Sequence, residues 1–387
     1  MKKTIEDIDV AGKRVLMRVD FNVPLHEGEI ADDRRIQMSL PSIKSVLDRG
    51  GFVTLMSHLD RPSGTGFEEK YSLAPVATRL SKLLNQPVSF SDTDDSSPLI
   101  LRENLRFHAE EKSGNETFAK QLSQSADIYC NDAFGTAHRS HTSMIAVPKV
   151  MEGKPRVAGL LLAKELQYLG QAIENAEHPF VAILGGAKVS DKLGVIEHLL
   201  GKVDTILIGG AMAYTFLVAR GEQVGNSFVE RDRVQDAEEI LAVAKASTTE
   251  ILLPTDHVCA KQIVQGTPVQ VVSGSIQDGW KGVDIGPETI CAFTHCLLQA
   301  KTIVWNGPMG VFETEPFDVG TKEIAKTIAL ATKGGAVSIV GGGDSAAAVS
   351  AFGLDDQMTH ISTGGGASLQ MLEGIEFSSV ALLDDAV

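Results

Sequence analysis

The sequence is poor in cysteine and has no long apolar run. Only four of its 387 residues are cysteine, and no two of them form a CxxC pair. The fold therefore needs no disulfide framework, and the scattered thiols indicate a reducing compartment. No apolar stretch approaches the roughly 18 residues of a membrane-spanning helix, and the opening MKKTIEDIDVAGKR has no apolar signal core. We expect a cytoplasmic protein.

Basic residues are also in short supply. The chain has 35 lysines and arginines against 50 acidic residues, which gives a formal net charge of −15. Such a balance disfavours nucleic acid and anionic membranes as partners. If the protein binds a small anion, its basic side chains must be gathered locally against this overall charge.

Two familiar nucleotide motifs are missing. Neither GxGxxG nor GxxxxGK[ST] occurs, which counts against a dinucleotide-dependent dehydrogenase and a P-loop ATPase. The length predicts two or three domains, and 43% hydrophobic residues are enough for large cores. In the first half, strand-like runs such as Arg14–Asp20 and Phe52–Ser57 alternate with helical patterns at about 33–49 and 73–84. This alternation predicts a parallel α/β sheet.

The second half repeats one arrangement, in which an apolar strand runs into glycine and then into a helix. It occurs at Val181–Lys188, Thr205–Met212, Thr302–Gly310, Ser338–Ser345 and His360–Ser368. A doubly wound sheet places such strand ends along one crevice. A helical pattern from about residue 163 to 176 separates the halves, and we place a domain boundary there.

The stretch VAILGGAKVSDK, residues 181–192, is the clearest candidate phosphate site. A strand that ends in glycines and opens into a helix presents free N–H groups at one point. Lys188 and Lys192 are four residues apart, so we expect both on one face of the helix's first turn. A tight turn with two solvated lysines fits the same residues.

The segment SIVGGGDS adds a candidate cation site. Gly341–Gly343 would let a polyphosphate approach the backbone, and Asp344 and Ser345 fall at a helix start. An aspartate beside phosphates needs a divalent cation such as Mg²⁺ between them. Alternatively, Asp344 only complements the helix dipole and Ser345 only caps the helix. Glu313 could bind a ribose or be an ordinary surface residue.

The first half carries a different set of polar residues, mostly basic and placed just after predicted strands. They are Asp20, Asn22, Arg35, His58, Arg61, Arg106 and Arg139. In a parallel sheet these positions share one edge, where several arginines would form a pocket for a small, multiply charged anion. Each arginine alone could equally be in a surface ion pair. A domain for an anion and a domain for a Mg-nucleotide together predict phosphoryl transfer.

Nine segments, taken in order over nearly the whole chain, resemble the phosphoglycerate kinase family. They are RVDFNVP (18–24), DDRRI (32–36), SHLDRP (57–62), ENLRF (103–107), NDAFGTAHR (131–139), GGAKVSDK (185–192), WNGPMGVFE (305–313), GGGDS (341–345) and STGGGAS (362–368). The resemblance implies reversible transfer of a phosphoryl group between 1,3-bisphosphoglycerate and ADP, giving 3-phosphoglycerate and ATP with Mg²⁺. It also implies a glycolytic monomer with two Rossmann-like domains that face each other across a cleft and close about a hinge.

The resemblance further implies an extent for each domain and a role for each motif residue. The triose domain would span residues 1–170, the nucleotide domain 171–374, and residues 375–387 would return to the first domain. Arg35 and Lys188 would be catalytic, because they would neutralise the migrating phosphoryl group. The triose would contact Asp20, Phe21, Asn22, Arg35, His58, Leu59, Asp60, Arg61, Arg106 and Arg139. The nucleotide would contact Lys192, Gly209, Gly210, Glu313, Gly342, Gly343, Asp344 and Ser345, with Mg²⁺ on Asp344.

The chain departs from the family pattern beside the expected triose site. Asp60 replaces the glycine of SHLGRP, and we expect it to strain the turn or weaken substrate binding. Tyr214 follows the glycines expected near adenine and would affect packing there, while Ser345 replaces threonine but keeps the hydroxyl. The alternatives are a nicotinamide-dependent dehydrogenase and a catalytically impaired nucleotide-binding paralogue. The presence of Arg35, Lys188 and Asp344 argues against the impaired form.

Overall fold

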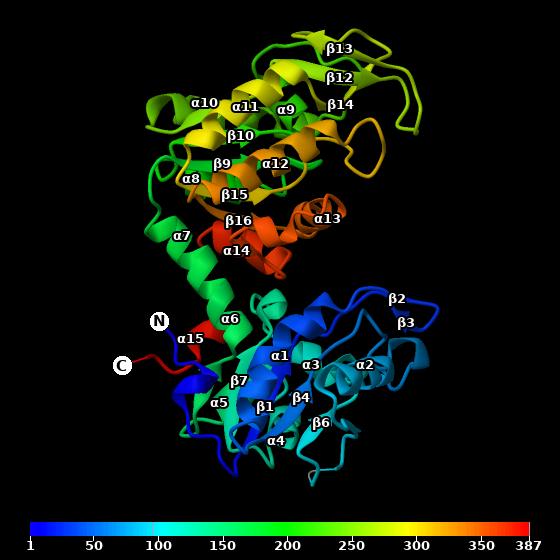
Figure 1. Ribbon diagram of the computed structural model, residues 1–387, viewed down its shortest axis with the longest axis vertical. Helices are drawn as coiled ribbons and strands as arrows, with labels where there is room; N and C mark the ends of the chain where they lie inside the picture. The colour runs from blue at the N-terminus through cyan, green and yellow to red at the C-terminus, as the bar shows by residue number, and fades with distance from the viewer. Residues whose placement is uncertain (95, 387) are drawn as a thin grey trace. The chain divides into compact units, whose positions relative to one another are not determined.

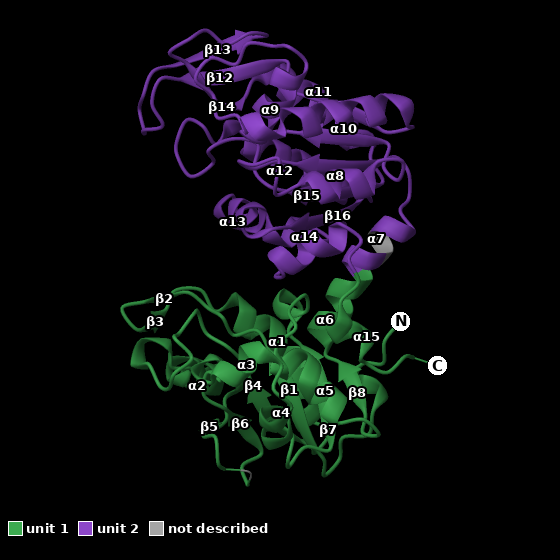
Figure 2. Cartoon of the chain, turned by 180° about the vertical axis from the view of Figure 1, so that it is seen from behind, with its two compact units in different colours: residues 1–167, 376–387 green, residues 168–375 purple. Residues whose placement is uncertain are grey.

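The chain forms two compact units in the computed structural model. The structure describes residues 1–94 and 96–386, and for residues 171 and 172 the backbone alone. Unit 1 comprises Met1–Gln167 and Glu376–Val387, and unit 2 is Tyr168–Ile375 (Figure 2). Val387, the last residue of the expected returning segment, lies outside the described residues. The domain boundaries predicted from the sequence, after residues 170 and 374, lie three residues later and one residue earlier than these divisions.

Unit 1 is built on a six-stranded sheet in which all neighbouring strands are parallel. In pairing order the strands are β5 (Ser89–Phe90), β6 (Leu99–Leu101), β4 (Phe52–Met56), β1 (Arg14–Val19), β7 (Ile128–Asp132) and β8 (Arg156–Ala158). Strand β1 is buried along its whole length, as expected for a parallel strand covered on both faces. The predicted α/β class is confirmed.

The helices of unit 1 follow the apolar periodicity of the sequence. They are α1 (Arg34–Leu47), α2 (Ala74–Leu84), α3 (Ala109–Ser113), α4 (Glu116–Leu122), α5 (Val147–Val150), α6 (Leu160–Glu165) and α15 (Ser378–Ala381). Helix α1 buries Ile36, Ile43 and Val46 in the core. A short hairpin of β2 (Leu25–His26) and β3 (Glu29–Ile30) interrupts the loop before α1. Two-residue strands leave no periodic signal, so the sequence does not reveal this hairpin.

Unit 2 has its own parallel sheet of six strands and a smaller antiparallel sheet. The large sheet pairs β11 (Glu250–Leu252), β10 (Thr205–Ile208), β9 (Phe180–Leu184), β15 (Thr302–Asn306), β16 (Val337–Gly341) and β17 (His360–Ile361) in that order. The small sheet pairs β13 (Val269–Ser273), β12 (Asp256–Ala260) and β14 (Lys281–Ile285). The five glycine-bearing strand ends of the sequence belong to β9, β10, β15, β16 and β17, so the parallel sheet carries them all at one edge.

Helices flank this sheet as well (Figure 1). They are α8 (Leu193–Leu199), α9 (Met212–Ala219), α10 (Val234–Ala246), α11 (Pro287–Gln299), α12 (Val319–Lys333), α13 (Gly343–Ala351) and α14 (Gly366–Leu372), and the short α7 (Gln171–Glu174) belongs to the connection that precedes β9. Helix α11 packs against α12, and α8 packs against α10 and α14. A core of apolar side chains that includes Ile183, Trp305 and Ile328 fills the space beneath α11 and α12.

The predicted connecting helix is present but not regular. Helix α6 continues as a π-helix over Leu166–Gly170 and then as α7, and the chain leaves the helical path before the cis peptide bond His178–Pro179. The division between the units falls inside the π-helix. Among the described residues, no helix combines the length and the apolar character that a bilayer crossing requires.

Candidate functional site

In unit 1, the carboxyl edge of the sheet gathers basic side chains. Asp20 follows β1, His58 follows β4, Arg106 lies in the turn after β6, and Arg139 follows β7. The charges of Arg18, Arg106, Arg139 and Arg35 all act on His58 and, after burial itself, lower its pKa well below the usual value. The sequence prediction that these residues meet at one sheet edge is therefore correct. We call this group the arginine cluster: Arg18, Arg35, Arg106 and Arg139.

Asp20 and His58 tie two members of the arginine cluster together. Arg35 donates a hydrogen bond of 2.8 Å to Asp20 Oδ2. His58 Nδ1 lies 3.9 Å from Asp20 Oδ1 and 3.1 Å from Arg18 Nη2. Because arginine has only donors, Nδ1 of His58 accepts this hydrogen bond and the ring is neutral with its hydrogen on Nε2. The cluster keeps its positive charge on guanidinium groups.

The electrostatic state of the cluster suits an anion. Burial and the neighbouring arginines lower the pKa of Arg106 to about 10, and burial together with Arg106, Arg18 and Arg139 lowers that of His141 to about 4. Buried Nε atoms of Arg106 and Arg139 have no hydrogen-bond partner. Buried donors without partners and mutually repelling cations are stabilised when a multiply charged anion binds them.

The loop after β4 presents its backbone to this cluster. Asn22 Oδ1 accepts a hydrogen bond of 2.8 Å from the Asp60 amide, and Arg106 Nη1 donates one of 2.6 Å to the Asp60 carbonyl. Asp60 has φ of 51°, in the left-handed region that favours glycine. The strain expected from the sequence is therefore present at this turn.

Three further residues that the family resemblance assigns to the triose, Phe21, Leu59 and Arg61, follow the same two strands, β1 and β4. The side chains of Phe21 and Leu59 are packed in the core of unit 1, so only their backbone faces the loop. Asn104 binds both the amide and the carbonyl of Leu59, at 3.1 and 2.7 Å. Arg61 is exposed at the surface. The predicted triose contacts of Phe21 and Leu59 are therefore backbone contacts, and that of the exposed Arg61 side chain stays a prediction.

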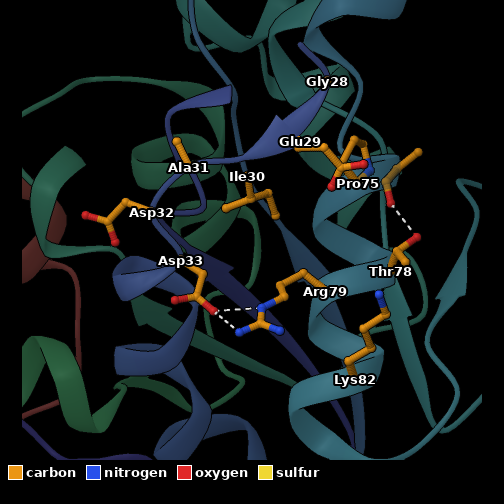
Figure 3. Close-up of a pocket in the computed structure, with 11 residues that line it drawn as sticks. Gly28, Glu29, Ile30, Ala31, Asp32, Asp33, Pro75, Thr78, Arg79 and Lys82 are labelled. Atoms are coloured by element: carbon orange, nitrogen blue, oxygen red, sulfur yellow. Dashed lines mark hydrogen bonds and ion pairs between the residues drawn. The ribbon is translucent and has the colours of Figure 1, made fainter. Parts of the chain in front are cut away.

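Unit 1 also has a cleft of about 900 Å³ that is separate from the arginine cluster. It lies between the β2–β3 hairpin and α2 (Figure 3). Its arginine, Arg79, is bound to Asp33 at 2.6 Å, and Asp32 and Glu29 add further negative charge to the lining. Because a phosphate there would meet three carboxylates, the arginine cluster is the better anion site.

In unit 2, the strand–glycine–helix prediction for residues 181–192 needs a correction. Helix α8 begins only at Leu193, with Lys192 as its N-cap, so Lys188 is in the preceding loop and the two lysines do not share a helical turn. Gly186 has φ of 103°, and Ser190 is bound through its amide and hydroxyl to Glu230 at 3.1 and 2.7 Å. These contacts hold the segment as an open loop. Lys188 is exposed there, whereas Lys192 is half-buried.

Lys192 reaches the edge of the sheet. Its ammonium group donates a hydrogen bond to Asn306, the last residue of β15. Burial lowers the pKa of Lys192 to about 8, although Asp191, Asp344 and Glu373 act in the opposite direction. A buried ammonium group that lacks a full counter-charge is a suitable partner for a phosphate.

The glycine loops line two adjoining clefts in unit 2. The first, about 560 Å³, contains Lys188, Lys192 and the start of α13 from Gly342 to Ser345. The second, about 470 Å³, contains Gly210, Tyr214 and Glu313, and both clefts share Gly186, Ala187 and Asp344. A polar, lysine-bearing cleft beside a more apolar one fits the phosphates and the base of one nucleotide.

The start of α13 has the open backbone that the sequence predicts. Gly342 is the N-cap residue with φ of 89°, and Asp344 is exposed in the first turn. Ser345 neither caps the helix nor faces solvent. Its buried hydroxyl accepts a hydrogen bond of 2.6 Å from the amide of Gly307, which fixes the β15 loop against α13.

Gly209 and Gly210 are required by packing. A Cβ on Gly210 would lie 2.5 Å from backbone atoms of Gly186, and one on Gly209 would lie 2.4 Å from the sulfur of Met309. Gly210 lines the second cleft. Tyr214 is buried in the same cleft with its ring 5.4 Å from that of His257, so it does shape the packing there.

Two residues of these sites were not predicted from the sequence. Arg18 is fully buried in the arginine cluster, and Asn306 holds Lys192. An arginine inside an otherwise apolar strand is a detectable signal, because a buried charge needs a partner or a ligand. Asn306 carries no comparable signal, since asparagine commonly ends a strand for local reasons.

Comparisons with known proteins agree on one family. The family model described as phosphoglycerate kinase matches residues 5–375. Phosphoglycerate kinases of Rhodopirellula baltica and Chloroherpeton thalassium are 57% and 50% identical to the chain, and each alignment covers 100% of both proteins. The solved phosphoglycerate kinase of Coxiella burnetii is 38% identical with a TM-score of 0.92, over 99% of this chain and 98% of that one. The chain belongs to the phosphoglycerate kinase family.

Proposed function

We propose that the protein is a glycolytic phosphoglycerate kinase. It would transfer the acyl phosphate of 1,3-bisphosphoglycerate to ADP, giving 3-phosphoglycerate and ATP, and catalyse the reverse reaction. In the reverse direction the acceptor is a carboxyl group. One observation carries this proposal. A single chain of this family contains both the arginine cluster, in unit 1, and the lysine-bearing glycine loops, in unit 2.

The arginine cluster would bind the triose. Arg106 and Arg139 have buried Nε donors without partners, and Arg35 is held in place by Asp20. Guanidinium groups match phosphate and carboxylate in bidentate geometry. Asn22 and the turn at Asp60 would complete the site through the backbone contacts already described.

The two clefts of unit 2 would bind the nucleotide. Lys192 and the amides at the start of α13 suit the phosphates, and Gly210 and Glu313 line the neighbouring cleft for base and ribose. The exposed carboxylate of Asp344 fits Mg²⁺, since hard oxygen ligands beside phosphate are what that ion prefers. When bound, Mg²⁺ would neutralise charge on the phosphate oxygens.

The main catalytic requirement of this reaction is to neutralise negative charge on the migrating phosphoryl group. The leaving carboxylate of the acyl phosphate needs no general acid, and the developing charge lies on the migrating phosphoryl oxygens. Lys188 is exposed on its loop and Arg35 projects from the first turn of α1, so both can meet a ligand. We assign charge stabilisation in the transition state to these two residues. Because they belong to different units, the proposal includes hinge bending and exclusion of water during transfer.

A coupled assay tests the function. ATP-dependent phosphorylation of 3-phosphoglycerate, linked to NADH oxidation by added glyceraldehyde-phosphate dehydrogenase, should be robust in the wild type. Arg35→Ala and Lys188→Ala should each lower kcat by orders of magnitude, whereas Lys202→Ala, an exposed lysine outside both clefts, should not. No turnover in the wild type would refute the function, and full activity in Lys188→Ala would refute the role of that lysine.

The proposed working form is a cytoplasmic monomer. Its four cysteines, Cys130, Cys259, Cys291 and Cys296, are all free, which suits a reducing compartment. Analytical ultracentrifugation at the concentrations used in the assay should give a single species near 41.3 kDa. A larger active species would contradict this part of the proposal.

A further inference from the structure

Glu111 is a buried carboxylate behind the arginine cluster. It is on α3 and is fully inaccessible to solvent. Its two oxygens accept hydrogen bonds from Ser143, at 3.0 Å from the amide and 2.6 Å from the hydroxyl. Arg18, Arg106 and His141 also face it, and the Nδ1 atom of His141 lies 3.7 Å from Oε1. Burial raises the pKa of Glu111, and the two arginines oppose that shift.

Ser143 passes this contact on to Arg18. The serine hydroxyl has one hydrogen, which it donates to Glu111, so its lone pairs face the Nε atom of Arg18 at 2.9 Å. The guanidinium group of Arg18 also binds the carbonyl of Val19 and the Nδ1 atom of His58. Glu111, Ser143, Arg18 and His58 therefore form one directed chain of hydrogen bonds, which ends in the proposed triose site.

We propose that Glu111 is a positioning residue for the triose site, acting through Ser143 and Arg18 to fix the ring and the tautomer of His58. This inference deepens the proposed function and rests on it. Arg18 must donate to Nδ1 of His58 to keep the imidazole hydrogen on Nε2. Glu111 supplies the negative charge that a buried guanidinium group needs near it when no substrate is bound.

The hydroxyl of Ser143 is the link that can be removed with the least change in volume. Ser143→Ala leaves both the Nε atom of Arg18 and an oxygen of Glu111 without this partner, so the guanidinium group is held only by Val19 and His58. The matched control is Thr142→Ala. Thr142 precedes Ser143 in the same π-helix and is also buried, but its hydroxyl binds only backbone, Glu110 O at 2.6 Å and Asn115 N at 2.7 Å.

Two readouts separate positioning from a general loss of structure. The first is the KM for 3-phosphoglycerate against the KM for ATP. The second is the pair of ¹⁵N shifts of the His58 ring, which report its tautomer and can be assigned with a His58→Gln sample. Ser143→Ala should raise the KM for 3-phosphoglycerate about tenfold, leave the KM for ATP within twofold and move the His58 shifts toward a mixture of tautomers. Thr142→Ala should change none of the three.

Several outcomes would overturn the proposal. These are unchanged His58 shifts in Ser143→Ala, an equal rise in both KM values, or the same pattern in Thr142→Ala. If Ser143→Ala does not fold, Glu111→Gln replaces it, because an amide keeps the shape and an acceptor but loses the charge; it should still raise the KM for 3-phosphoglycerate. A wild type without turnover would refute the proposed function instead, since the His58 shifts can be measured without any reaction.

Discussion

Replacing Asp60 by glycine should stabilise the protein. Asp60 has φ of 51°, and left-handed backbone costs a residue with a Cβ roughly 1–2 kcal/mol. The contacts of this residue to Asn22 and Arg106 use its amide and carbonyl, which glycine keeps. Glycine loses more backbone entropy on folding than aspartate does, which offsets about 0.5–1 kcal/mol of this gain in stability. The net gain should be about 0.5–1 kcal/mol, which corresponds to roughly 1–4 °C in the melting temperature of a unit of this size.

Substrate binding should change in the same variant for a separate reason. Asp60 places a negative charge on a turn whose carbonyl is bound by a member of the arginine cluster. Asp60 is exposed, so solvent screens its charge, and removing it should lower the KM for 3-phosphoglycerate only about two- to threefold. Scanning calorimetry measures the first effect and the coupled assay the second.

Two further variants separate backbone strain from charge. Glu27 also has φ of 51°, but it is in the β2–β3 hairpin. Glu27→Gly should therefore raise the melting temperature by a similar amount and leave the KM unchanged. Asp60→Asn removes the charge and keeps the Cβ, so it should lower the KM without a comparable gain in stability. A melting temperature that falls in Asp60→Gly would refute the strain argument, and an unchanged KM in both Asp60 variants would refute the charge argument.

Three other predictions concern unit 2. The pKa of Lys192 is lowered to about 8, and a bound phosphate would raise it, so nucleotide binding near pH 8.5 should take up protons. Calorimetry in buffers of different ionisation enthalpy measures this proton uptake. Undiminished uptake in Lys192→Met would contradict the prediction. Ser345→Ala leaves the buried Gly307 amide unpaired and should lower the free energy of unfolding by about 1–3 kcal/mol. The control Ser350→Ala should lower it less, because the hydroxyl of Ser350 is only partly buried. Equal losses in the two variants would refute the stabilising role of the Ser345–Gly307 hydrogen bond. Chelation of Mg²⁺ should abolish turnover, and Asp344→Asn should raise the Mg²⁺ concentration needed for half-maximal rate; an unchanged requirement would separate Asp344 from the cation.

Much of the architecture could be predicted because buried parallel strands have a recognisable sequence pattern. Buried runs such as VAILG and TIVWN are apolar along their full length, and the glycines after them mark where the chain turns. The meeting of His58 with the arginines follows from topology alone, since the carboxyl ends of parallel strands share an edge. That reasoning uses only the order of elements, so it survives errors of one or two residues in their bounds.

The wrong prediction of Lys188 in a helical turn shows that topology does not predict the contacts of individual polar side chains. The spacing of the two lysines fits a helix, but the Ser190–Glu230 contact, made across 40 positions of the chain, keeps the segment out of the helix. Ser345 is a similar case, because its partner Gly307 belongs to another strand end. In both cases a polar side chain has a partner that is distant in sequence. Local patterns carry no information about such partners.

The discontinuity of unit 1 has a consequence for the order of events at the ribosome. Residues 376–387 belong to unit 1 but are translated after the whole of unit 2, about 200 residues, which takes roughly 10–40 s at 5–20 residues per second. Ser379 Oγ donates a hydrogen bond of 2.6 Å to the carbonyl of Ala137, two residues before Arg139, and Asp385 binds Lys2 at 2.8 Å. The earliest-made unit of the protein is thus the last to be completed, because these contacts can form only after the whole of unit 2 has been translated.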